Sequence, residues 1–183
     1  MRSLTAANQL TILRMLFIPA FVIMMLYDYH GWALVLFVAA GLTDGLDGLI
    51  ARWTGQKTTL GAWLDPMADK LLLVTTFVML TLPGGQANRF PLWLTVLVIS
   101  RDVAIVLTVA IINMALGPRT FRPSILGKIA TAVYIVTCGV TLLFNYLGEA
   151  SPVVEFMIYA SLVITLASAA HYLILTTRLI AQS

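Results

Sequence analysis

Six runs of about twenty mostly apolar residues constrain this chain more than any other feature of its sequence. They cover residues 10–29, 32–52, 60–82, 92–116, 126–147 and 153–176 of a chain of 183 residues. A helix of about 20 apolar residues is long enough to cross the hydrocarbon core of a bilayer. We therefore predict an all-α integral membrane protein, built as a bundle of six transmembrane helices.

The segments between these runs are short and contain turn-forming or charged residues. With 60% hydrophobic and 10% charged residues and a mean hydropathy of +0.95, the chain leaves no room for a soluble domain. Neither a low-complexity segment nor an internal repeat is visible, so we expect residues 1–183 to form a single domain. No small-residue cleavage site follows the first run, which we therefore predict to be a span rather than a secretory signal.

Lysine and arginine set the expected orientation of the bundle, because cytoplasmic loops are enriched in both. With six spans, Arg89 is alone on one face of the membrane. The other face receives Arg2, Arg14, Arg52, Lys57, Arg119, Arg122, Lys128 and Arg178. Both termini are therefore expected to be cytoplasmic.

Four carboxylates interrupt the second and third apolar runs. Asp44 and Asp47 are three residues apart, and Asp65 and Asp69 are four apart, so each pair shares one face of a helix. The connection between the two runs is short, and we expect an antiparallel hairpin that brings the pairs together. An ionised carboxylate at membrane depth is costly unless a cation or water compensates it.

The composition of this acid cluster favours a hard divalent cation. Carboxylate oxygens are the preferred ligands of Mg²⁺ and Mn²⁺, whereas His30 and His171 are remote in sequence and Cys138 is the only cysteine. Two ions would neutralise the four charges. In the structural alternative the acids pair with basic residues, but Arg52, Lys57 and Lys70 would offset three charges at most.

Small residues surround the acids and leave space beside the backbone. Gly45, Gly48 and Ala51 precede Arg52, and Gly61 and Ala62 follow on the next run. Such a face serves either close helix packing or a ligand that approaches the backbone. A guanidinium beside bound divalent ions suits a bridging phosphate, so the combination of metal and Arg52 suggests a diphosphate substrate.

These residues form a motif that resembles the signature of the CDP-alcohol phosphatidyltransferases. The motif is Asp44-x2-Asp47-Gly48-x2-Ala51-Arg52-x8-Gly61-x3-Asp65-x3-Asp69, and upstream Asn8-x2-Thr11-x2-Arg14 is similar to the start of the family's first helix. The resemblance implies six spans and a reaction in which a hydroxyl attacks the β-phosphorus of a CDP-linked lipid and releases CMP. It also implies two Mg²⁺ or Mn²⁺ ions.

The same resemblance assigns roles to individual residues. Asp44, Asp47 and Asp65 would hold the two ions, and Asp69 would contact one ion and act as general base. Contacts to the CDP-lipid would come from Asn8, Gly48, Ala51, Arg52, Thr58 and Gly61. This division suits phosphoryl transfer, which needs two metals to neutralise charge and a base to take the proton of the attacking hydroxyl.

The acceptor alcohol is suggested by basic residues in the second half of the chain. Ser100-Arg101-Asp102 resembles the CMP-forming cardiolipin synthases, whereas phosphatidylglycerophosphate synthases typically have Arg-Glu there. Arg101, Arg119, Arg122 and Lys128 are the candidate contacts to the acceptor. Two alternatives stay open: a structural pairing of Arg101 with an acid, and a role of Arg119 and Arg122 as loop charges alone.

The sequence therefore predicts a transferase that moves the phosphatidyl group of CDP-diacylglycerol to phosphatidylglycerol and so forms cardiolipin. The alternative is a phosphatidylglycerophosphate synthase, with glycerol 3-phosphate as acceptor. A membrane prenyltransferase and a divalent-cation transporter are more remote. The family commonly forms homodimers, and we expect a bacterial or mitochondrial inner membrane, an active site that faces the cytoplasm or matrix, and no nucleic-acid partner.

Overall fold

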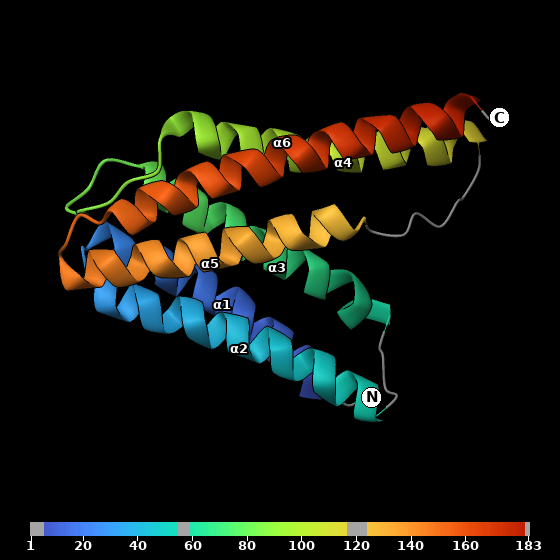
Figure 1. Ribbon diagram of the computed structural model, residues 1–183. Helices are drawn as coiled ribbons and strands as arrows, with labels where there is room; N and C mark the ends of the chain where they lie inside the picture. Colours follow the sequence, from blue (N-terminus) through green and yellow to red (C-terminus); the bar gives the residue numbers. More distant parts are fainter. Residues whose placement is uncertain (1–5, 55–58, 117–123, 182–183) are drawn as a thin grey trace. The chain divides into compact units, whose positions relative to one another are not determined.

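The computed structural model describes residues 6–54, 59–116 and 124–181, and every regular element in these ranges is an α-helix (Figure 1). The helices are α1 (Ala6–Leu26), α2 (His30–Thr54), α3 (Thr59–Thr81), α4 (Leu92–Leu116), α5 (Ile125–Leu147) and α6 (Pro152–Ala181). Each coincides with one predicted apolar run, apart from a few residues at its ends. The prediction of an all-α fold is therefore confirmed.

Among the described residues, two helices are long and apolar enough by themselves to cross a membrane. They are α5 and the Pro152–Ile174 part of α6, whose most apolar stretches have mean hydropathies of 1.8 and 1.9. Only 33% and 28% of these apolar stretches are buried inside the protein. Apolar surface exposed on this scale is expected where a helix faces lipid, which supports a membrane location. Six spans and the side on which the termini lie stay predictions.

A Schellman motif closes α1 and turns the chain into α2. The N–H of Tyr29 donates to the Met24 carbonyl at 2.8 Å, and the N–H of Asp28 donates to the Met25 carbonyl at 3.2 Å. Asp28 has a φ of 57°, a left-handed conformation that aspartate tolerates better than most residues. Its Oδ1 accepts a hydrogen bond from the N–H of Gly85 at 3.1 Å, which ties this turn to the loop after α3.

The junction between α5 and α6 uses the same type of helix end. Gly148 has a φ of 73°, and the N–H of Glu149 donates to the Phe144 carbonyl at 3.1 Å. Glycine adopts this conformation without steric cost. Ser151 then caps α6, because its Oγ accepts a hydrogen bond from the N–H of Val153 at 3.2 Å. The predicted break between the fifth and sixth runs is thus confirmed.

Packing divides the chain into two compact units. The first comprises residues 1–89 and 138–150, and the second comprises residues 90–137 and 151–183. Because the boundary falls within α5, that helix contributes residues to both units. The expected single domain over residues 1–183 stays a prediction.

In the first unit, α1 is the main packing partner of both α2 and α3. Direct contacts between α2 and α3 are few among the described residues, and the expected antiparallel hairpin of these two helices stays a prediction. The apolar interior of this unit includes Phe21, Met25, Ala33, Phe37, Ala40, Leu72, Phe77, Leu80 and Leu142. Helix α1 therefore holds together the two helices that carry the acid motif.

A buried amide pair joins the loop after α3 to α5 within the same unit. Asn145 Oδ1 accepts hydrogen bonds from the backbone N–H of Asn88 at 2.7 Å and from its Nδ2 at 3.1 Å. In return, Asn145 Nδ2 donates to the Asn88 carbonyl at 3.1 Å. Asn88 Nδ2 also donates to the Glu149 carbonyl at 2.7 Å. These bonds satisfy polar groups that would otherwise be costly to bury.

In the second unit, α4 packs against α6, and hydroxyl groups connect α6 to the first part of α5. The hydroxyls of Tyr134 and Thr165 are 2.5 Å apart, and those of Thr137 and Ser161 are 2.9 Å apart. All four residues are buried. Hydroxyl pairs of this kind allow polar side chains to lie in an apolar interior.

Candidate functional site

The four predicted metal ligands lie on the two helices that α1 contacts. Asp44 and Asp47 belong to the second half of α2, and Asp65 and Asp69 belong to the first half of α3. The backbone is helical at both places, as predicted, so each pair shares a helix face. The four side chains lie outside the part that the structure describes, and the approach of the two pairs to each other stays a prediction.

The residues expected to contact the CDP-lipid belong to the same three helices. Asn8 is in α1, Gly48, Ala51 and Arg52 are near the end of α2, and Gly61 is in the first turn of α3. Their side-chain positions, and Thr58 altogether, lie outside the described residues. That these residues form one CDP-lipid site stays a prediction.

Helix α1 also carries a charged side chain in the interior of the first unit. Arg14 has 0% of its surface exposed. In the sequence, Arg14 is part of the motif that begins at Asn8 and one of the charges that orient the bundle. Its burial is new, since hydropathy does not reveal which face of α1 packs against α2 and α3. A buried guanidinium is costly in a membrane protein and needs polar or charged surroundings.

Arg101, the first predicted acceptor contact, is held by two other side chains of the second unit. Its Nη1 donates to Asp102 Oδ1 at 2.7 Å, and its Nη2 donates to the hydroxyl of Ser168 on α6. Only 9% of the residue is exposed. Its Nε is buried and has no hydrogen-bond partner in the described structure. The pairing with an acid that the sequence left open as a structural alternative is therefore present, and the Nε–H group has no partner among the described residues.

The Arg101 guanidinium also lies beside the first turn of α5. A Cβ added to Gly127 would be 3.4 Å from Arg101 Nη2 and 3.1 Å from Ser124 Oγ. Ser124 caps the helix, because its Oγ accepts a hydrogen bond from the N–H of Gly127 at 3.0 Å. Lys128, the next residue, is exposed. An arginine at a helix N-terminus, with a lysine in that turn, is a favourable environment for an anion such as phosphate.

The structure thus brings Arg101 close to the start of α5, the helix that carries Lys128, in agreement with their expected roles as contacts to one acceptor. Arg119 and Arg122 lie outside the described residues, and their role stays a prediction. Ser168 and Gly127 were not identified as site residues from the sequence. Ser168 lies 67 residues from Arg101, and no local motif indicates that the two are in contact.

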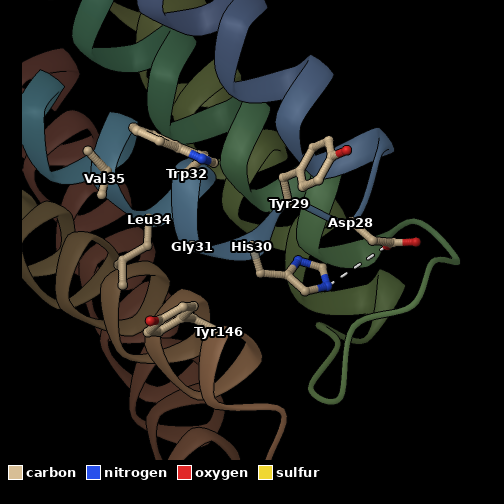
Figure 2. A pocket seen from close by; sticks show the side chains of 8 residues that line it. All are labelled: Asp28, Tyr29, His30, Gly31, Trp32, Leu34, Val35 and Tyr146. Atoms are coloured by element: carbon tan, nitrogen blue, oxygen red, sulfur yellow. Dashed lines mark ion pairs between the residues drawn. The ribbon is translucent and has the colours of Figure 1, made fainter.

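A separate pocket of about 590 Å³ opens at the start of α2 (Figure 2). None of the residues predicted to bind metal, CDP-lipid or acceptor lines it. Its wall contains the exposed aromatic side chains of Tyr29, Trp32 and Tyr146, and His30 Nε2 lies 3.8 Å from the Asp28 carboxylate. Exposed tyrosine and tryptophan beside an apolar helix are typical of the membrane–water interface.

Comparison with known proteins identifies the family. The model of the CDP-alcohol phosphatidyltransferase family matches residues 4–171. The chain belongs to this family. The match covers α1 to α5 and most of α6, so it contains the complete acid motif, Arg101 and Lys128.

Several known proteins are similar in sequence to this chain. The "Probable phosphatidylglycerophosphate synthase" of Mycobacterium tuberculosis (strain ATCC 25618 / H37Rv) is 35% identical over 144 residues, which cover 75% of this chain and 65% of the relative. The "Cardiolipin synthase (CMP-forming)" of Homo sapiens is 34% identical over 161 residues, which cover 78% of this chain and 52% of the relative. The matches therefore span about half to two thirds of the curated relatives.

Proposed function

We propose that this protein transfers the phosphatidyl group of CDP-diacylglycerol to an acceptor hydroxyl and releases CMP. The observation that carries the proposal is the complete acid motif from Asp44 to Asp69, which lies within the range matched by the family. Family membership favours this transferase activity over the prenyltransferase and transporter alternatives.

The four acids are also the best candidates for metal ligands on chemical grounds. The chain has eight acidic residues, and the other four, Asp28, Asp102, Glu149 and Glu155, are described by the structure. Among the described residues, no group of three or more His, Cys, Asp or Glu is arranged to hold a metal ion. The carboxylate oxygens of Asp44, Asp47, Asp65 and Asp69 fit Mg²⁺ or Mn²⁺. When bound, two such ions would offset the charge that develops on the phosphate oxygens.

In the proposed reaction, Asp69 accepts the proton of the acceptor hydroxyl. The hydroxyl oxygen then forms a bond to the β-phosphorus, and the bond between that phosphorus and the oxygen of CMP breaks. Arg52, together with Asn8, Gly48, Ala51, Thr58 and Gly61, would position the CDP-lipid. A positioned base of this kind typically contributes a factor of about 10² to 10⁴ to the rate.

We propose phosphatidylglycerol as the acceptor, so that the product is cardiolipin. Support comes from the Ser100-Arg101-Asp102 segment and from similarity to cardiolipin synthases. Glycerol 3-phosphate is the second candidate, because a phosphatidylglycerophosphate synthase is similar to a comparable degree. Both acceptors carry a phosphate, which suits the basic surroundings of Arg101 and Lys128.

The proposed enzyme is a multi-pass protein of six spans and a homodimer. Its two termini and its active site would face the cytoplasm or the mitochondrial matrix. The predominance of lysine and arginine on one face of the predicted bundle supports this orientation. The apolar lengths of α5 and α6 support insertion into the membrane.

An assay with defined acceptors tests the proposal. The purified protein is incubated with CDP-diacylglycerol and Mn²⁺, and with phosphatidylglycerol or glycerol 3-phosphate in separate reactions. We expect CMP and cardiolipin in the first reaction. Turnover with glycerol 3-phosphate alone would assign the protein as a phosphatidylglycerophosphate synthase. Absence of CMP from both reactions would contradict the proposed function.

A further inference from the structure

The Arg101 guanidinium is oriented by two contacts that come from different parts of the chain. Asp102 is its neighbour on α4, and Ser168 belongs to α6. The aspartate supplies charge, but its position next to Arg101 in the sequence restrains the guanidinium from one side only. The Ser168 hydroxyl fixes the other side, because it accepts a hydrogen bond from Nη2.

Ser168 is one of three buried hydroxyl residues that follow one face of α6. Ser161, Thr165 and Ser168 are four and three residues apart, and all three are buried. The first two are paired with hydroxyls of α5, namely Thr137 and Tyr134. Only Ser168 bonds to a charged side chain. The three hydroxyls are therefore all buried on one face of α6, but they have different partners. Ser161 is for this reason a matched control for Ser168.

The contact with Ser168 places the guanidinium where an anion is favoured. Arg101 Nη2 lies close to Gly127, in the first turn of α5, where a Cβ added to the glycine would be in van der Waals contact with it. The free N–H groups of a helix N-terminus and a guanidinium both donate hydrogen bonds to phosphate oxygens. Arg101 is also more than nine-tenths buried, and its Nε has no hydrogen-bond partner in the described structure.

From this geometry we infer that Ser168 is a positioning residue for the acceptor phosphate: it orients Arg101 toward the first turn of α5, where the phosphate of the acceptor binds. The inference rests on the proposed function. Phosphatidylglycerol carries a phosphodiester and glycerol 3-phosphate carries a phosphomonoester. In both acceptors the group that Arg101 would bind is a phosphate. Ser168 does not contact the substrate, so its effect is transmitted through Arg101.

Steady-state kinetics of Ser168→Ala, Ser168→Thr and Ser161→Ala test this inference. Loss of the Ser168 hydroxyl should raise the KM for the acceptor roughly tenfold, the usual effect of one hydrogen bond to a charged group. The KM for CDP-diacylglycerol should change less than about twofold, since the bond concerns the acceptor alone. Ser168→Thr keeps the hydroxyl and should restore most of the acceptor affinity. Ser161→Ala should leave the acceptor KM unchanged.

A second mutation separates positioning from general stability. In an Arg101→Ala background, Ser168→Ala should have no further effect on the acceptor KM, because its partner is absent. Both acceptors are assayed, and the thermal midpoint of each variant in detergent is recorded. An unchanged acceptor KM in Ser168→Ala, equal effects on both substrates, or equal effects of Ser161→Ala would overturn the inference. If the wild type releases no CMP with either acceptor, the proposed function fails instead.

Discussion

Buried polar residues are where individual side chains matter most in this protein. Arg101 is held by an acid and a hydroxyl, and Asn145 by the backbone and side chain of Asn88. Arg14 is buried completely. In a protein interior, loss of one partner of a hydrogen bond leaves the other polar group without compensation. Substitutions at these positions should therefore have effects that hydropathy alone would not indicate.

The proposed general base gives the first prediction. Asp69→Asn should abolish CMP release, because asparagine accepts no proton, while binding of the CDP-lipid is largely kept. Turnover is measured as CMP release and binding by titration of the nucleotide lipid. Retained turnover in this variant would show that the base is another residue.

Asp44→Asn serves as the comparison for Asp69→Asn, since it removes a proposed metal ligand rather than the base. It should weaken Mn²⁺ and CDP-lipid binding together. An unchanged dependence of the rate on Mn²⁺ concentration would contradict a ligand role for Asp44.

The second prediction concerns the buried amide pair. Asn145→Ala removes three hydrogen bonds to the buried Asn88. The free energy of unfolding should fall by about 2 kcal/mol or more. Denaturant or thermal unfolding in detergent measures the loss. Tyr146→Phe, at the exposed neighbouring position, is the control and should have little effect.

At the scale of elements, the sequence predicts the helices well because their lengths and breaks follow from local chemistry. Asp28 and Gly148 adopt left-handed conformations at the ends of α1 and α5, and Ser151 caps α6. Turn residues of these types are visible in the sequence before any packing is known. The direct partner of each helix is not visible: among the described residues, α1 contacts α2 and α3 more extensively than these two contact each other, and the expected hairpin of α2 and α3 stays a prediction.

The turn at Asp28 gives the third prediction. Asp28→Ala places a residue with a short apolar side chain in a left-handed conformation and removes the bond to Gly85. Together, the strained backbone and the lost hydrogen bond should lower the free energy of unfolding by about 1 to 3 kcal/mol. Asp28→Asn tolerates the same conformation and keeps an acceptor oxygen, so it should remain near the wild type. Equal midpoints for the alanine and asparagine variants would show that the turn does not depend on this side chain.

At the scale of the whole molecule, membrane topology is the main prediction that is not yet tested. With six spans, Ala87 and Glu149 are on the outer face and Gln56 is on the inner face. Single cysteines are introduced at these positions in a Cys138→Ala background, and intact cells are treated with a membrane-impermeant maleimide. Ala87→Cys and Glu149→Cys should be labelled, and Gln56→Cys should react only after permeabilisation. Labelling of Gln56→Cys in intact cells would contradict the expected orientation.

The sequence by itself determined the class of this protein. Hydropathy and turn residues located all six helices, and the acid motif with its small residues pointed to the family that the comparisons confirm. Such signals are local, since helix periodicity and chain reversal depend on residues a few positions apart. They also place Asp44 and Asp47 on one face of α2 without any knowledge of packing.

Only the tertiary structure decided which polar side chains are buried and what holds them. Ser168 and Arg101 are 67 residues apart, and Asn88 and Asn145 are 57 apart. Contacts of this kind depend on how helix faces meet, and a hydropathy pattern is the same whichever neighbour a face selects. For that reason Arg101 and the start of α5 were predicted from the sequence as acceptor contacts, whereas the contact of Arg101 with Ser168 on α6 came only from the packing.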